Sequence, residues 1–416
     1  MGISSVVVVG LGYIGLPTAA ILASNGIDVI GVDVDPRTVD AVNRGVVPFV
    51  EPDLSTYVAA AIERGTLRAT TEPEPADAFI VAVPTPFKGN HEPDLSYIES
   101  AARALAPHLR DDALVILEST SPPGATEQMA RWITEVRPDL GYDGRTGPRI
   151  HVAHCPERVL PGRVMHELVT NDRIVGGLTH EAALRAQELY AVFCEGQILL
   201  TNAVTAEMAK LVENSYRDVN IAFANELSII AKNLGIDIWE LISLANHHPR
   251  VNILQPGPGV GGHCIAVDPW FIVDAEPEAS RLIRTAREVN DAKPGWVIDQ
   301  VHEMLQDSEA PTVALLGIAF KPDIDDLRES PALRIAKTLS GEYASGRILA
   351  VEPHIDALPT ELSDSHNIEL VSLDTALAAS DATVVLVDHT AFRIEADQIR
   401  ENSAKFVDTR GLVSKR

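Results

Sequence analysis

Cysteine and positive charge are both scarce in this sequence. Its 416 residues include three cysteines, Cys155, Cys194 and Cys264, with no C-x-x-C pair among them. This excludes a disulfide framework and a zinc site of known spacing, so we expect no metal and a reducing, cytoplasmic setting. Lysine and arginine number 34 against 59 acidic residues, a formal net charge of −25. Such a field repels nucleic acid and anionic membranes, so neither is an expected partner.

The first 27 residues also lack the features expected of a targeting segment. Residues 1–27 carry no charged side chain, yet Gly10, Gly12, Gly15 and Pro17 interrupt their apolar run. They have neither the basic segment nor the small-residue cleavage site of a signal peptide. We therefore expect a strand, a tight turn and a helix here.

The composition that remains is that of a folded protein, with 46% hydrophobic and 22% charged residues. Short β-branched runs alternate with helical patterns at both ends of the chain, whereas residues 203–305 show only helical apolar spacing. The expected strands lie at 6–9, 29–32, 79–83, 113–117 and 150–153, and again at 312–317, 347–351, 368–371, 383–387 and 405–407. We predict an α/β protein with two Rossmann-like doubly wound domains, 1–200 and 307–416, joined by an all-helical central region, 201–306.

The first expected strand leads directly into a glycine motif. Gly10, Gly12 and Gly15 form G-x-G-x-x-G between that strand and an apolar helical pattern. The glycines permit a tight turn and close approach of a pyrophosphate, whose charge the helix N-terminus favours. Asp33 ends the next strand, where its carboxylate can accept both ribose hydroxyls of NAD and repel the extra phosphate of NADP. The motif therefore predicts NAD as cofactor.

Two further segments follow expected strands. Pro84-Thr85-Pro86 comes after the third strand, and residues 118–124 come after the fourth. Ligands bind at the carboxyl ends of strands in open sheets, although an ordinary proline-directed turn explains each segment equally well.

The glycine-rich run 255–264 ends in Cys264. Crowded backbone amides in such a run can surround a ligand, and polar His263 and Asp268 flank the thiol. A lone cysteine is usually a small buried hydrophobe, but this context predicts a reactive nucleophile.

Polar residues at helical spacing could assist this thiol. Lys210 and Asn214 are spaced i, i+4, and Arg217 and Asp218 continue the same face. A solvated helix face is the simpler interpretation of the four residues alone. Beside a nucleophilic cysteine, however, an ammonium and an amide would stabilise an oxyanion.

An NAD site combined with a nucleophilic cysteine suggests a four-electron oxidation. Hydride loss from an alcohol gives an aldehyde, the thiol adds to it, and a second hydride loss gives a thioester that water hydrolyses to a carboxylate. An oxidation that stops at the aldehyde or ketone needs no such cysteine.

Together these motifs resemble the nucleotide-sugar 6-dehydrogenases, the UDP-glucose/UDP-N-acetylmannosamine dehydrogenase family, over almost the whole chain. The family oxidises the C6 alcohol of a UDP-sugar to a uronate with two NAD. The resemblance implies Cys264 as nucleophile, Asp268 as an aid to proton transfer, and Lys210 and Asn214 as holders of the oxyanion. It also implies Thr120 as an active-site residue and Glu157 as the residue associated with thioester hydrolysis.

The same resemblance implies the ligand contacts. NAD would lie against Gly10, Gly12, Tyr13, Ile14, Gly15, Asp33, Thr85, Thr120, Thr126 and Arg328. The UDP-sugar would lie against Arg158, Val159, Lys210, Asn214, Arg217, His248, Arg250, Gly261, Phe320, Lys321 and Arg410. In addition, Ser330 before Pro331 predicts a capped helix start that favours an anion.

Local departures favour one branch of the family. UDP-glucose dehydrogenases usually carry a second glutamate where this chain has Pro161, and a lysine where it has Val267. Residues 155–162, followed by 171–173, instead look like the UDP-N-acetylmannosamine branch. We expect oxidation of UDP-N-acetyl-D-mannosamine for polysaccharide biosynthesis by a homodimer joined through the central helices. UDP-GlcNAc, UDP-GalNAc or UDP-glucose, a two-electron β-hydroxyacid dehydrogenase and a non-catalytic binding scaffold remain alternatives.

Overall fold

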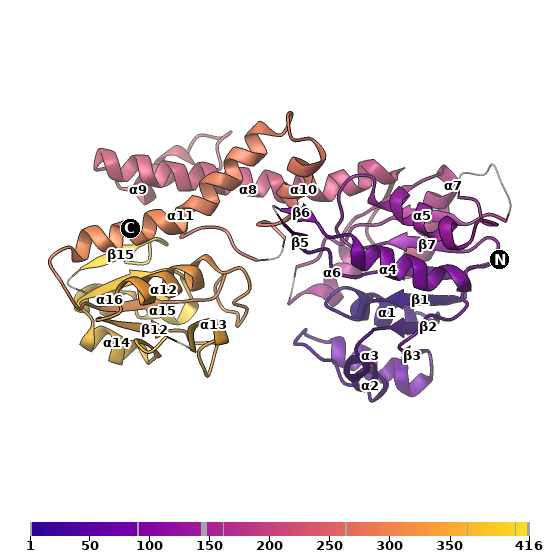
Figure 1. Cartoon of the computed structure of the whole chain (residues 1–416), viewed down its shortest axis with the longest axis horizontal. Coiled ribbons are helices and arrows are strands. Elements are labelled where there is room, and N and C mark those ends of the chain that lie inside the picture. Colours follow the sequence, from indigo (N-terminus) through magenta and orange to yellow (C-terminus); the bar gives the residue numbers. More distant parts are fainter. Residues whose placement is uncertain are drawn as a thin grey trace. The chain divides into compact units, whose positions relative to one another are not determined.

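The computed structural model describes residues 2–89, 91–142, 148–160, 162–262, 264–363, 365–403 and 405–413. Pro161 and His263, both quoted above, lie outside this described part. The chain divides into two compact units, Met1–Glu213 and Asn214–Arg416, and each contains a largely parallel sheet (Figure 1). Helices alone follow one another along the chain from residue 203 to residue 305 in the described part. The predicted α/β class is confirmed.

The sheet of the first unit runs in the order β10-β9-β8-β7-β4-β1-β2-β3. Its neighbours are parallel, except that β8 and β9 pair antiparallel. The strands are β1 Ser5–Val9, β2 Asp28–Val32, β3 Leu67–Thr70, β4 Ala78–Val81, β7 Leu114–Leu117, β8 His151–His154, β9 Arg173–Gly177 and β10 Ile198–Asn202; β5 Phe87–Lys88 and β6 Glu92–Pro93 form a separate hairpin. The strand order reverses between β1 and β4, the position where open sheets of this kind bind ligands.

Helices cover both faces of this sheet. Because side chains alternate along a strand, Val6 and Val8 of β1 pack on one side, with α1, α3, α6 and α7. Val7 and Val9 pack on the other side, with α4 and α5. The helices are α1 Gly15–Ser24, α2 Pro36–Asn43, α3 Leu54–Arg64, α4 Ser96–Leu105, α5 Ala125–Val136, α6 Val164–Thr170 and α7 His180–Tyr190.

Long helices dominate the middle of the sequence. Helix α8, Ala203–Leu234, contains the boundary between the two units. It is followed by α9 Ile238–Ala245, α10 Asp268–Ala275 and α11 Arg281–Leu305. The glycine-rich run lies between α9 and α10, and the turn 264–267 connects it to the start of α10 at Asp268.

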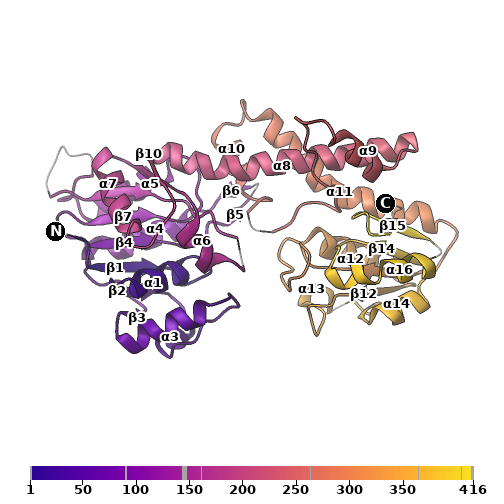
Figure 2. The same ribbon diagram turned by 180° about the vertical axis from the view of Figure 1, so that it is seen from behind.

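The sheet of the second unit runs in the order β13-β12-β11-β14-β15, and all of its pairs are parallel. Strands β12, β14 and β15 of this sheet are labelled in Figure 2. One face packs with α11 and α12, the other with α14, α15 and α16. The predicted cap at Ser330 is confirmed, because its Oγ accepts the Leu333 N–H at 3.2 Å. The elements are β11 Thr312–Leu316, α12 Pro331–Glu342, β12 Arg347–Val351, α13 Thr360–Ser363, β13 Ile368–Leu370, α14 Leu373–Ala379, β14 Ala382–Val385, α15 Thr390–Ile394, α16 Ala396–Asn402 and β15 Phe406–Asp408.

Candidate active site

The glycine motif forms the turn between β1 and α1. Gly10 has φ 95°, a conformation that side-chain-bearing residues rarely adopt. A Cβ on Gly15 would overlap the carbonyl oxygen of Gly10, so close helix–strand packing requires glycine there. A Cβ on Gly12 would meet no atom within 4 Å, which leaves its backbone open to an incoming group. The turn therefore has the shape that a pyrophosphate needs.

Asp33 stands at the end of β2, beside this turn. Its Oδ2 accepts the Leu11 N–H at 3.0 Å, and its Oδ1 accepts the Asp35 N–H at 2.9 Å. These bonds fix the carboxylate at the position where a ribose would be recognised. Of the other residues in the motif, Tyr13 is exposed with its ring 4.2 Å from that of Phe49, and Ile14 is the N-cap of α1.

The predicted threonines occupy two different environments. The Thr85 hydroxyl donates to the carbonyl of Thr120, so the segments after β4 and β7 are joined at the carboxyl edge of the sheet. Thr126 is fully buried instead, and its hydroxyl donates to Glu207 at 2.5 Å. Its side chain therefore ties α5 to α8.

Glu157 lies just after β8, in a buried charged cluster. Its Oε1 accepts the Arg158 N–H at 2.6 Å, and its Oε2 lies 3.8 Å from the guanidinium of Arg173. Arg173 also lies 3.8 Å from buried Glu118, which directly follows β7. Burial and the charge of Glu157 raise the pKa of Glu118 to about 7. Sequence reasoning quoted Glu118 only within a turn motif and gave Arg173 no function.

Arg158 and Lys210 differ in their partners. The Arg158 guanidinium forms a two-pronged ion pair with Glu213, at 2.7 and 3.1 Å, and donates to the Asp172 carbonyl. The side chain of Lys210, partly exposed on α8, makes no hydrogen bond or ion pair with any described residue. Its ammonium is therefore available to a ligand. Val159, beside Arg158, is half-buried.

Cys264 is exposed and is the first residue of the turn 264–267 that precedes α10. Its carbonyl accepts the backbone N–H of Asp268 at 2.8 Å, so the thiol-bearing residue and the aspartate are joined by one turn. The Asn214 amide donates to Asp268 Oδ2 at 2.5 Å. The structure therefore brings the predicted Asn214 and Asp268 together at the base of the cysteine loop.

The predicted polar face of α8 needs one correction. Asp218 is completely buried, and its carboxylate accepts from the guanidinium of Arg287 at 2.6 Å and from Asn290 at 2.8 Å. It therefore anchors α11 rather than continuing an open face. Arg217, next to it, is exposed.

The glycine-rich run packs closely against the third region of the sequence. A Cβ on Gly261 would overlap the Glu329 carbonyl and lie 2.8 Å from Pro331, and one on Gly262 would lie 3.0 Å from the Phe320 ring. Likewise, a Cβ on Gly257 would lie 2.7 Å from the Arg410 guanidinium. The predicted substrate residues Gly261, Phe320 and Arg410 thus line one contact zone.

Most of the remaining predicted ligand residues are charged. Arg410 donates to Asp388 at 2.8 Å and reaches the Pro256 carbonyl at 3.5 Å. Lys321 has its Nζ 5.8 Å from the Phe320 ring, and Arg328 pairs with Asp326 at 2.6 Å. His248 and Arg250 are exposed after α9 and contact each other through an N–H to ring nitrogen bond of 3.3 Å.

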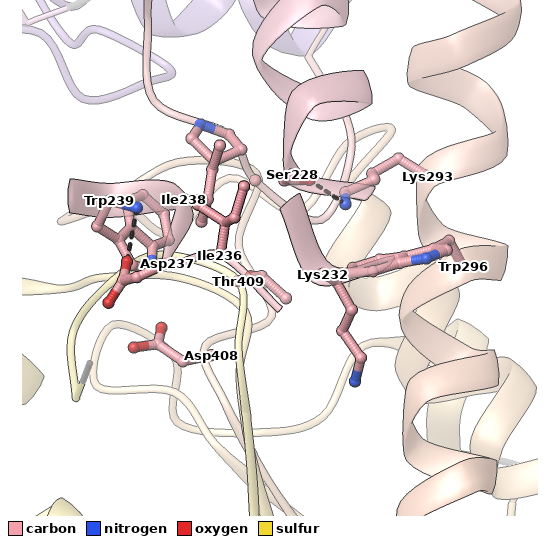
Figure 3. A pocket seen from close by; sticks show the side chains of 12 residues that line it. Ser228, Lys232, Ile236, Asp237, Ile238, Trp239, Lys293, Trp296, Asp408 and Thr409 are labelled. Atoms are coloured by element: carbon pink, nitrogen blue, oxygen red, sulfur yellow. Dashed lines mark hydrogen bonds between the residues drawn. The ribbon is translucent and has the colours of Figure 1, made fainter. Parts of the chain in front are cut away.

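The structure also contains a pocket that sequence reasoning missed. A cavity of ≈ 290 Å³ lies among the end of α8, the start of α9 and α11 (Figure 3). Buried Lys293 lies on its wall, donates to Ser228 Oγ at 2.6 Å, and has its Nζ 3.5 Å from the Trp296 ring centroid. Burial lowers the pKa of Lys293 to about 7. The signal in the sequence was a lysine at an apolar helical position.

A second unpredicted cluster joins Asp323, His354 and His389, whose polar atoms lie within 4.8 Å of one another. His389 Nδ1 accepts the Asp323 N–H at 3.0 Å, so its Nε2 donates to Glu352 at 3.1 Å. Because both ring nitrogens are engaged, this cluster is better explained as a hydrogen-bond network than as a metal site.

Family models match the chain in three consecutive segments. Residues 4–194, 204–292 and 314–415 match the NAD binding, central and UDP binding domains of the UDP-glucose/GDP-mannose dehydrogenase family. The chain belongs to this family. The predicted family resemblance is thus confirmed. NAD is its cofactor, and the open turn at Gly12 beside Asp33 fits that cofactor. The protein is an NAD-dependent sugar dehydrogenase.

Full-length relatives are closely similar. The chain is 58% identical over 409 residues to the NDP-N-acetyl-D-galactosaminuronic acid dehydrogenase of Ralstonia nicotianae, covering 98% of this chain and 96% of that one. It is 56% identical over 423 residues to the UDP-N-acetyl-D-mannosamine dehydrogenase of Escherichia coli, covering 99% and 100%. A solved structure of UDP-D-ManNAc dehydrogenase from Pyrococcus horikoshii has a TM-score of 0.87 at 38% identity, covering 99% and 96%.

Within the described residues, every helix is too short or too polar to span a membrane.

Proposed function

We propose that this dehydrogenase oxidises the C6 alcohol of UDP-N-acetyl-D-mannosamine to the uronate, through a thioester on Cys264. The observation that carries the proposal is the exposed Cys264 at the end of a glycine run. Asp268 lies one turn later, where its N–H donates to the Cys264 carbonyl and its carboxylate accepts from the Asn214 amide. The departures at Pro161 and Val267 and the 56% identical relative named for this substrate support it.

The chemistry balances with two equivalents of cofactor. NAD, when bound, accepts one hydride in each of two oxidations. The first oxidation also releases the alcohol proton and leaves an aldehyde, to which the Cys264 sulfur adds. The second removes the remaining hydride and a proton from the adduct, leaving a thioester. Water then supplies the second carboxylate oxygen, and the sulfur leaves and regains a proton.

Each residue has a proposed role in these steps. Lys210 and Asn214 hold the oxygen of the adduct, where an ammonium and an amide donor stabilise developing negative charge. Asp268 shuttles protons, Glu157 accepts the proton of the attacking water, and Thr120 contacts the reacting groups. Arg158, Arg217, Arg250, Lys321 and Arg410 offset the two phosphate charges of UDP against an acidic protein.

A second substrate is favoured by a separate observation. The 58% identical relative carries a name in the N-acetylgalactosamine series. The two sugars differ in the orientation of ring substituents, which selects between them through pocket shape. UDP-GalNAc is therefore the second candidate.

The test is to count NADH per sugar with each of UDP-ManNAc, UDP-GalNAc, UDP-GlcNAc and UDP-glucose. We expect two NADH and one uronate from UDP-ManNAc. Two NADH only from UDP-GalNAc would select the second candidate, and one NADH with an aldehyde product would contradict the thioester. Cys264→Ala should yield no uronate, whereas Lys210→Ala should retain a rate lower by about a hundredfold.

We also propose a homodimer joined through the central helices. Helix α8 exposes several large apolar side chains in a single chain: Val212, Tyr216, Phe223, Ile230 and Leu234. Apolar side chains along one helix are typical of an interface. Sedimentation should give twice the monomer mass, and Tyr216→Glu should shift the protein toward the monomer.

A further inference from the structure

Glu118 is a buried acid that none of the steps above uses. It directly follows β7, and its side chain is shielded from solvent. Thr18 of α1 donates to its Oε2 at 3.1 Å, and Tyr190 of α7 donates to its Oε1 at 3.2 Å. The Arg173 guanidinium of β9 lies 3.8 Å away.

The cluster contains two carboxylates and one guanidinium. Arg173 lies 3.8 Å from Glu118 with one terminal nitrogen and 3.8 Å from Glu157 with the other. Its guanidinium packs over the ring of Tyr190 at 4.7 Å and also contacts the Cys155 sulfur at 3.7 Å. No other cation forms an ion pair with either glutamate among the described residues. One positive charge is therefore shared by two buried acids.

Because Glu118 and Glu157 share the charge of Arg173, the ionisation of one carboxylate affects the other. Burial of two negative charges near one cation is unfavourable, so one of the acids tends to retain a proton. The pKa of Glu118, raised to about 7 by burial and by the charge of Glu157, is consistent with Glu118 being that acid. Thr18 and Tyr190 act in the opposite direction, because their hydroxyls donate to its charged form.

We propose that Glu118 is a positioning residue that controls, through Arg173, how readily Glu157 takes a proton from the water that hydrolyses the thioester. This inference rests on the proposed function, in which Glu157 activates that water. While Glu118 is neutral, the positive charge of Arg173 acts on the carboxylate of Glu157 alone. When Glu118 ionises, Arg173 is shared, and Glu157 accepts a proton more readily.

The proposal predicts a pH-dependent hydrolysis step. Acyl-enzyme at Cys264 would be formed in a single turnover with NAD and UDP-ManNAc, quenched with acid at intervals, and quantified by intact mass. Between pH 6 and pH 8 we expect its decay in the wild type to accelerate about threefold to tenfold. Glu118→Gln, which copies the neutral acid, should decay slowly at every pH and change by less than about twofold.

Tyr190→Phe provides a matched variant that keeps every charge. It removes one donor to ionised Glu118, so the midpoint of the pH dependence should move upward while the rate at high pH stays unchanged. A merely structural effect would lower the rate at all pH values without moving the midpoint. Circular dichroism checks that both variants are folded.

Two results would overturn the inference. One is a wild-type decay that does not change between pH 6 and pH 8. The other is a Glu118→Gln decay that keeps the wild-type pH profile while Glu157→Gln accumulates acyl-enzyme. If Glu157→Gln itself decays at the wild-type rate, the assigned role of Glu157 fails, and the coupling with Glu118 fails with it.

Discussion

Each sheet of this protein has a buried glutamate directly after one of its parallel strands, yet the two behave in opposite ways. Glu118 follows β7, and burial raises its pKa to about 7. Glu352 follows β12, and although burial acts in the same direction, hydrogen bonds from His389 and from backbone N–H groups hold its pKa below its usual value. The same sequence pattern, an apolar strand followed by an acid, can therefore either raise or lower the pKa of that acid.

The partners explain the difference. Glu352 accepts the N–H groups of Ile318 and Ala319, at 2.8 and 3.0 Å, together with His389 at 3.1 Å. Among the residues that the structure describes, Glu118 accepts from two hydroxyls and shares a distant guanidinium with Glu157. Fixed amide dipoles pointing at a carboxylate stabilise its charge, whereas a competing acid destabilises it. Hydrogen-bond donors around a buried acid therefore oppose the effect of burial on its pKa.

The largest effect is expected from removing the well-bonded acid. Glu352→Ala leaves buried amide donors and His389 without an acceptor, so unfolding free energy should fall by about 3–5 kcal/mol. Urea denaturation followed by circular dichroism measures this loss. Glu352→Gln keeps one acceptor oxygen and should lose less; equal losses would mean that the amide bonds contribute little.

The next largest effect is a dependence of the unfolding free energy on pH, which should have opposite signs for Glu118 and Glu352. The folded pKa of Glu118 lies above its unfolded value, so its contribution to stability is complete below about pH 4.5 and is lost as the pH rises through about 7. Relative to the wild type, Glu118→Gln should gain up to about 3 kcal/mol over that interval. Glu352 contributes above about pH 4.5 and loses its contribution at lower pH. Urea melts of both Gln variants from pH 4 to pH 8 should therefore diverge; parallel curves would contradict the comparison.

A smaller effect is expected at a buried charged group whose pKa is shifted by burial and not by a neighbouring charge. Lys293 has no carboxylate partner among the described residues, and burial lowers its pKa to about 7. Between pH 7 and its usual value the unfolded chain binds more protons, so stability should rise with pH in that window. Lys293→Met should remove this slope and stabilise the protein at pH 7 by roughly 1–2 kcal/mol. Thermal melts at several pH values test it, and an unchanged slope would show that Lys293 is hydrated.

The smallest effect concerns one hydroxyl. Thr18→Val keeps the shape of the side chain but removes a donor to Glu118, and should cost about 1 kcal/mol at pH 8 and less at pH 5. The comparison is made by urea denaturation at both pH values. A larger loss at pH 5 would indicate that the hydroxyl serves packing instead.

Much of the fold could be predicted from local pattern. The apolar runs around Val6, Val29, Ile80, Val115 and Val152 all became strands, because uninterrupted β-branched sequence is typical of buried parallel sheets. Strands β3, β9 and β10 were missed, and so was the β5–β6 hairpin. Leu67–Thr70 is short and polar at alternate positions. Arg173–Gly177 begins with an arginine, a residue that is rarely buried in a strand unless, as here, it lies beside buried acids.

The candidate site was predicted in part. The glycine turn and the cysteine loop were visible because each depends on neighbours in sequence. The buried position of Asp218 and the cluster around Arg173 were not, since their partners come from segments 69 and 55 residues away. Contacts between residues so far apart in the sequence produce no local periodicity from which they could be predicted.

The fit of the glycine run against residues 320–331 has a consequence for engineering. At Gly261 and Gly262 the absent side chains are replaced by the ring of Phe320 and the backbone of Glu329. Neither stretch can be exchanged for that of another family member without carrying the other along. Chimeras that swap substrate preference should therefore transplant both stretches as a single module.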